Sequence, residues 1–126
     1  MDRKFVITGL GYAIVGLLLG IYMASTKNHS QLVTHAHIML IGFVVSFIYG
    51  VCHKLWLPSV SKALANVQFY VHQVGTFFVL VCLYFLYAGA VSESILGPIL
   101  GVSSILVLAA MILMKIMIIK STKNAI

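Results

Sequence analysis

The sequence has 126 residues, of which 62% are hydrophobic and only 8% are charged, and its mean hydropathy is +1.12. A soluble domain of this length carries many more charges, so the composition excludes the ordinary soluble classes and predicts an integral membrane protein. The formal net charge of +6 would suit a nucleic-acid partner, but its distribution along the chain indicates membrane topology instead.

Four apolar stretches are long enough to cross the roughly 30 Å of a bilayer core as helices. They cover about residues 5–25, 32–57, 64–89 and 94–119. Because the connections are short, we expect an all-α, antiparallel four-helix transmembrane bundle that forms one membrane domain over residues 1–126. The first stretch also resembles a signal peptide with a cut near Ala24, but its length favours a retained helix.

Basic residues mark one side of the membrane. They lie at the amino terminus, in the second connection and at the carboxyl terminus: Arg3, Lys4, Lys54, Lys62, Lys120 and Lys123. The other side carries Lys27 and Glu93. Since loops rich in Lys and Arg stay inside, we expect both termini in the cytoplasm of a bacterial inner membrane. The second helix then runs from the outer face inwards.

Small residues and sulfur-containing residues have packing roles in this reading. Gly9, Ala13, Gly16 and Gly20 share one stripe of the first helix, and Gly97 and Gly101 repeat the device in the fourth. Such stripes allow close helix approach, either within one chain or between copies.

Met111, Met114 and Met117 are predicted to pack in the core rather than bind metal. Cys52 and Cys82 are predicted to lie at levels too different for a disulfide.

The second stretch carries His35 and His37 near its start. Ionisable residues inside a membrane segment are costly and are therefore functional candidates. On a helical wheel of roughly 100° per residue, His35 shares a polar stripe with four later residues. These are Gly42, Ser46, Tyr49 and His53. His37 lies roughly 200° away from His35, on an apolar wall. That wall is formed by Ile41, Val44 and Ile48.

In the third stretch Gln68, His72 and Thr76 repeat every four residues and predict a second inward polar stripe. We expect His72 to lie at a height between Tyr49 and His53, where the three form a hydrogen-bonded cluster. His72 is then either a metal ligand or a buried histidine satisfied by Tyr49 or Gln68. His53 is expected to be structural.

Two histidines on opposite faces of one helix cannot bind the same metal ion. Neutral imidazole suits iron, copper and zinc, but the wall around His37 offers no carboxylate or thiol. A porphyrin brings four equatorial nitrogens and needs only axial ligands and an apolar slot, so heme b fits better than a bare ion. No C-x-x-C-H motif for covalent attachment is present.

At this point the residues resemble a known family. The run Thr34-His35-Ala36-His37, with Tyr49-Gly50, Trp56-Leu57-Pro58 and the segment 64–70, is similar to the tenth and eleventh helices of heme-copper oxidase subunit I. The resemblance implies that His35 binds one heme and His37 another, one on each side of the helix. The family usually has histidine at the place of Gln68, and further histidines for copper that this chain lacks, so one chain does not assemble an oxygen-reducing centre.

Subunit I has twelve helices in three similar arcs of four, and this chain resembles one arc. The resemblance therefore implies a homotrimer in which His35 of one subunit and His37 of the next hold a heme, for electron transfer or gas binding rather than catalysis. The expected partners are the lipid bilayer, further copies of the chain and a redox protein. Two alternatives remain: a copper-binding or copper-delivery protein helped by Met23 or Met39, and a cofactor-free accessory subunit of a respiratory complex.

Overall fold

The computed structural model describes residues 1–125, and side chains through residue 121, as a bundle of helical segments. The segments are α1 (Asp2–Thr26), α2 (Leu32–His37), η1 (Ile38–Val44), α3 (Val45–Trp56), α4 (Lys62–Ala88) and α5 (Glu93–Ala125). Because α2, η1 and α3 follow one another without a break, the described chain has four helices long and apolar enough to span a membrane. This confirms the all-α class and the four predicted spans, as expected of a multi-pass membrane protein.

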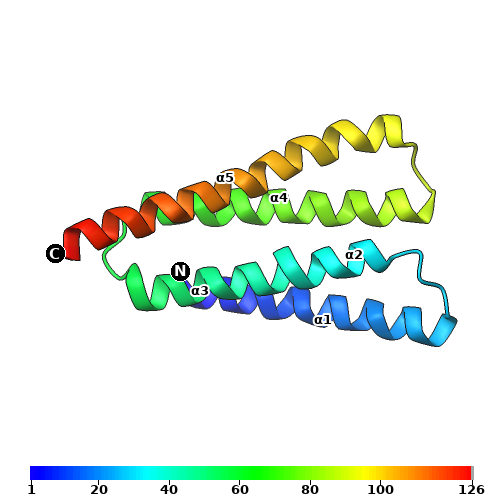
Figure 1. Ribbon diagram of the computed structural model, residues 1–126, viewed down its shortest axis with the longest axis horizontal. Helices are drawn as coiled ribbons and strands as arrows, with labels where there is room; N and C mark the ends of the chain where they lie inside the picture. The colour runs from blue at the N-terminus through cyan, green and yellow to red at the C-terminus, as the bar shows by residue number, and fades with distance from the viewer. Residues whose placement is uncertain (126) are drawn as a thin grey trace.

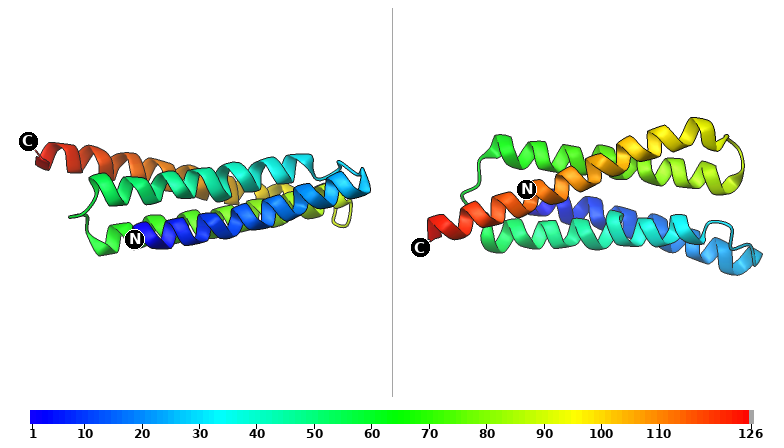
Figure 2. Two further views of the ribbon diagram at one scale, coloured as in Figure 1. Left: turned by 90° about the horizontal axis from the view of Figure 1, so that it is seen from below. Right: turned by 45° about the horizontal axis from the view of Figure 1, so that its top comes forward.

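The four spans are arranged as two helical hairpins (Figure 1). The first hairpin pairs α1 with the continuous helix α2–η1–α3, and the second pairs α4 with α5. Both termini lie toward the same end of the bundle, and α5 leans away from α2 toward the other end (Figures 1 and 2). The hairpins also touch at the far end, where Nε2 of Gln31 donates to the carbonyl oxygen of Tyr84 at 2.9 Å.

Local chemistry sets the ends of α4. The side chain of Ser61 caps its first turn by accepting a 3.5 Å hydrogen bond from the backbone N–H of Leu64. At the other end Gly89 has φ of 70°, a left-handed conformation that costs glycine little and stops the helix. The next helix then starts after a short turn, as the sequence predicts.

An aromatic and sulfur-rich core fills the end of the bundle nearest the termini. Its buried members are Phe5, Tyr49, Leu57, Phe69, Met114 and Met117. The burial of Met114 and Met117 confirms that they pack rather than face an open site, whereas Met111 is 45% exposed. Cys52 and Cys82 are both free, as predicted.

The small-residue stripe of α1 packs inside the chain. A Cβ on Gly9 would lie 3.2 Å from the Cβ of Ser46, and one on Gly16 would meet Ile38 at 3.0 Å. By contrast, no other group lies within 4 Å of such a Cβ on Gly97 or Gly101, within the described part of the chain. The stripe on α1 therefore serves the first hairpin, while the α5 stripe faces outward.

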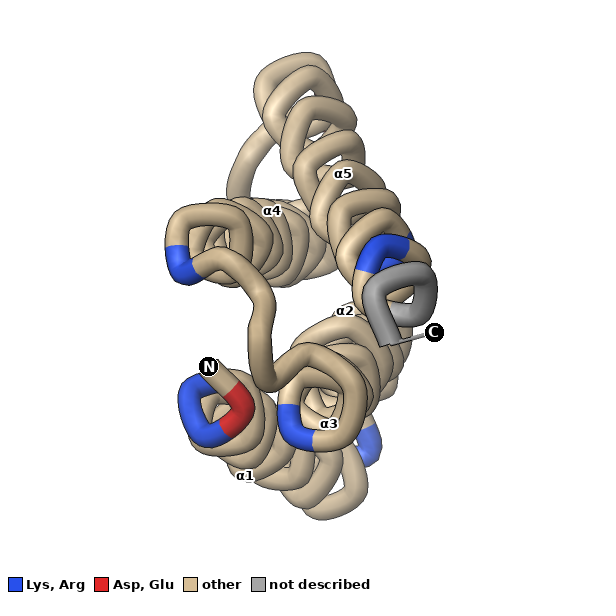
Figure 3. Tube along the Cα trace, turned by 90° about the vertical axis from the view of Figure 1, so that its left-hand side faces the viewer, with Lys and Arg blue, Asp and Glu red and all other residues tan. Residues whose placement is uncertain are grey.

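Most basic residues lie at the end of the bundle that carries the termini (Figure 3). Of the residues used to predict topology, Lys123 lies outside the described side chains. Arg3, Lys4, Lys54, Lys62 and Lys120 lie at this end, whereas Lys27 and Glu93 lie at the opposite end of the bundle.

Candidate functional site

His35 leaves α2 toward α1 and is held there by the backbone. Its Nδ1 lies 2.8 Å from the carbonyl oxygen of Gly16. Because a carbonyl only accepts, Nδ1 must carry the hydrogen and donate it. The neutral ring then has its lone pair on Nε2. Gly20 makes room for the ring, since a Cβ there would lie 3.1 Å from Cε1 of His35.

His37 is oriented in the same way by its own helix. Its Nδ1 donates to the carbonyl of Val33, 2.8 Å away and one turn earlier. Among the described side chains, through residue 121, neither His35 nor His37 has a hydrogen-bond partner at Nε2. Metal-binding histidines commonly donate one ring N–H to a carbonyl and coordinate through the other nitrogen. Both rings are therefore set up in the form that coordinates through Nε2.

A π-helical segment, η1, begins directly after His37. In π-helix the hydrogen bonds run from i to i+5, and short π segments are frequent at functional sites. One extra residue in a turn rotates everything beyond it by roughly 100° relative to a regular helix. A helical wheel drawn at a constant angle therefore fails between the histidine pair and the second half of the span.

The predicted polar stripe is buried most deeply in the second half of the span. Ser46, Tyr49 and His53 are 0%, 1% and 5% exposed. His35 is only half-buried, and it packs on α1, the helix that Ser46 also contacts. The most deeply buried residues in the first half of the span are Thr34 and Ile38, which are 1% and 5% exposed.

The predicted apolar wall lies on the outside of the single chain. Val44 is 40% exposed and Ile48 is 51% exposed, while Ile41 is half-buried. Val44 and Ile48 are therefore part of the apolar surface that the bundle offers to lipid or to a neighbouring protein.

His72 lies at the centre of a buried polar cluster between the hairpins. Its Nε2 is joined to Oγ of Ser46 by a 3.0 Å hydrogen bond, and Oγ1 of Thr76 lies 3.5 Å from both ring nitrogens. Gln68, His72 and Thr76 are each 0% exposed, which confirms the inward stripe of α4.

The partners predicted for His72 were wrong. Tyr49 touches the His72 ring edge-on, with centroids 5.1 Å apart, but its hydroxyl donates to Sδ of Met111 at 3.3 Å. Gln68 donates instead to the carbonyl of Ala110 at 3.2 Å. His53 stacks on Phe5 at 5.6 Å. Tyr49, His53 and His72 therefore each pack on Phe5, without the expected hydrogen bonds between them in the described part of the chain.

Three structural partners were missed by sequence reasoning: the Gly16 carbonyl, Gly20 and Ser46. Gly20 carried a usable signal, because it lies on the small-residue stripe of α1 at the height of His35. Ser46 was predicted to face the interior of the bundle, but its hydrogen bond with His72 was not predicted. The carbonyl of Gly16 has no sequence signal, since any residue supplies one.

The described donor set of one chain does not form a cage for a bare metal ion. Among the described side chains, no group of three or more His, Cys, Asp or Glu residues is close enough to hold a metal ion. His35 and His37 each offer one nitrogen, on opposite sides of a helix. One axial imidazole on an apolar surface is what a heme requires of a protein, so these residues fit that group.

No family model, curated protein or solved structure matches this chain. The resemblance to heme-copper oxidase subunit I therefore depends on the residues quoted above.

Proposed function

We propose that this protein is a membrane b-type cytochrome in which His35 and His37 are axial ligands of hemes held between subunits. One observation carries the proposal: both imidazoles donate Nδ1–H to a backbone carbonyl, at 2.8 Å, and present Nε2 on opposite sides of α2. If His35 and His37 were only structural, nothing would require both to leave Nε2 without a partner, one on each side of the helix.

The heme supplies an iron that takes up and releases one electron. The residues of the chain hold and shield it. Hydrogen bonds from His35 and His37 fix the planes of the imidazoles and raise their basicity as ligands. The exposed side chains of Val44 and Ile48, with half-buried Ile41, would provide apolar surface for the macrocycle and exclude water.

The resemblance to subunit I extends this to a homotrimer in the bacterial cytoplasmic membrane. In a ring of three, His35 of one copy faces His37 of the next, which gives each heme two histidines and leaves no open position for a gas. The lysine distribution supports cytoplasmic termini, with the histidine pair near the outer face. Electron transfer then follows more naturally than oxygen chemistry.

A reduced-minus-oxidised optical spectrum of the purified protein, expressed with ample heme, tests the proposal. We expect bis-histidine b-type bands, one heme per chain, and three chains per particle by native mass spectrometry. His35→Ala and His37→Ala should each remove most of the heme, whereas His29→Ala, in the exposed outer connection, should not.

Other outcomes separate the alternatives. Folded protein without heme bands contradicts the proposal. Equimolar copper that is lost in the same two variants favours copper binding. If both variants keep the stability of the original protein and it purifies with large respiratory partners, an accessory subunit is favoured instead.

A further inference from the structure

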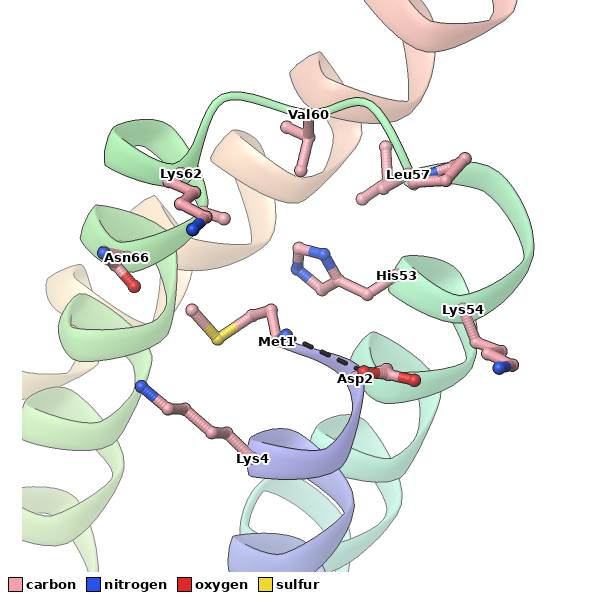
Figure 4. A pocket seen from close by; sticks show the side chains of 11 residues that line it. Met1, Asp2, Lys4, His53, Lys54, Leu57, Val60, Lys62 and Asn66 are labelled. Atoms are coloured by element: carbon pink, nitrogen blue, oxygen red, sulfur yellow. Dashed lines mark ion pairs between the residues drawn. The ribbon is translucent and has the colours of Figure 1, made fainter.

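A second candidate site lies at the end of the bundle that carries the termini, far from the histidine pair. A cavity of about 600 Å³ opens there between the starts of α1 and α4 and the end of α3. Lys4, His53, Lys62 and Asn66 provide polar lining, while Leu57 and Val60 provide apolar lining (Figure 4). The sequence indicated only a topology signal at these lysines.

His53 is the unusual member of this lining. It is only 5% exposed, yet its Nε2 has no hydrogen-bond partner among the side chains described through residue 121. The ring stacks on Phe5, with 19° between the planes, and extends into the cavity (Figure 4). Burying a polar nitrogen without a partner costs free energy, so an unsatisfied ring aimed into a cavity points to a missing acceptor or donor.

The charges around the cavity specify the chemistry of that partner. Three lysines, Lys4, Lys54 and Lys62, line the cavity. The only acidic residue among its described lining is Asp2. The Asp2 carboxylate is already paired with the amino terminus, at 3.7 Å. The cavity therefore has an excess of positive charge and N–H donors, and it lacks a matching anion. Phosphate, with several acceptor oxygens, suits such a donor set.

We propose that this cavity binds a phosphate group, with Lys4 and Lys62 as its counter-charges and His53 Nε2–H as a donor to one of its oxygens. The Asn66 amide can donate to a second oxygen. The cavity lies where the spans end, at the level of lipid headgroups, and basic pockets at the cytoplasmic side bind phospholipid head groups. The phosphate comes from an anionic lipid or from free phosphate in the cytoplasm, and the experiment separates these sources.

Native mass spectrometry of the full chain in neutral detergent measures the binding. Phosphatidylglycerol is titrated in one arm and inorganic phosphate in the other, with phosphatidylcholine as the zwitterionic comparison. Lys62→Gln changes an exposed side chain and should fold normally. We expect it, Lys4→Gln and His53→Phe each to weaken binding by roughly tenfold. The matched control is Lys120→Gln, which removes a charge from the same end outside the cavity.

Each outcome supports or overturns the proposal. Retention of phosphatidylglycerol alone, weakened by the cavity variants and unchanged in the control, identifies a lipid headgroup site. The same pattern with inorganic phosphate identifies a free-phosphate site. Equal losses in Lys62→Gln and Lys120→Gln would mean only general surface charge, and unchanged binding in Lys4→Gln and Lys62→Gln would overturn the site. Because no heme is measured, the result is independent of the proposed function.

Discussion

Oγ of Ser46 and Nε2 of His72 lie 3.0 Å apart, with both side chains fully buried, and join the two hairpins of the bundle. Ser46 follows η1 by two residues, so the rotation in the π segment turns it toward α4. The irregular part of the second span thus serves the contact between hairpins.

Ser46→Ala should lower the free energy of unfolding by about 1 kcal/mol, because His72 keeps only the distant Thr76 hydroxyl as a side-chain partner. Unfolding in mixed detergent micelles, followed by far-ultraviolet circular dichroism, measures the change. Ser104→Ala is the control, since the Ser104 hydroxyl bonds only the Leu100 carbonyl of its own helix on an exposed face. Equal stability of the two variants would contradict a role for the Ser46–His72 hydrogen bond.

Gly75→Ala should separate α4 from α5. A Cβ at this position would lie 3.0 Å from the carbonyl oxygen of Ser103 and 2.9 Å from the Cβ of Leu106, and backbone cannot move aside cheaply. We expect a loss of about 1–3 kcal/mol, the usual cost of overpacking, in the same unfolding assay. Gly11→Ala adds a methyl group where nothing lies within 4 Å in the described chain, so it should be neutral or slightly stabilising.

Gly20→Val tests the placement of His35 within the proposed cytochrome. A Cβ at Gly20 already comes within 3.1 Å of Cε1 of His35, so a branched side chain must displace the ring from the Gly16 carbonyl. Loss of such a supporting hydrogen bond typically costs about 10–100-fold in metal affinity. Heme per chain after dilution should fall accordingly, whereas Gly11→Val should retain it. Unchanged heme retention in Gly20→Val would mean that His35 is not a ligand in this position.

The expected orientation can be read from cysteine labelling in intact cells. Cys52 and Cys82 are first replaced by Ala, and single cysteines are then placed at the exposed Ser30, between α1 and α2, or Ser59, between α3 and α4. A membrane-impermeant maleimide should label Ser30→Cys from outside and Ser59→Cys only after lysis. The reverse pattern would place the termini outside and contradict the inference from the lysines.

Regular features of the spans were predictable because they depend on length and periodicity alone. The four helices follow from hydropathy, and the inward stripe of α4 follows from a four-residue repeat in an uninterrupted α-helix. The burial of Met114 and Met117 likewise follows from spacing along a regular helix. In each case a constant angle per residue is a valid description of the backbone.

The interior of the second span was predicted less well for a physical reason. The sequence of η1 contains no proline and no pair of glycines that would mark an irregular helix. Its one glycine, Gly42, packs against the ring of Tyr12. A single wheel therefore does not describe how the two halves of the second span are turned relative to each other. The partners of His72 depend on the rotation that η1 introduces and on the height of α3 relative to α4. Composition specifies neither. Tyr49 accordingly bonds Met111, a residue from a third helix.

The two-hairpin arrangement has a consequence for biogenesis. Helices in lipid gain little from apolar contact, so the union of the hairpins relies on interhelical polar groups such as Ser46 and His72. In the connection between α3 and α4 Leu57 is buried in the core, but Ser59 is exposed, so a cut at Ser59 would leave both hairpins whole. We therefore expect the two hairpins to insert separately and the co-expressed fragments to reassemble in the bilayer without a covalent link.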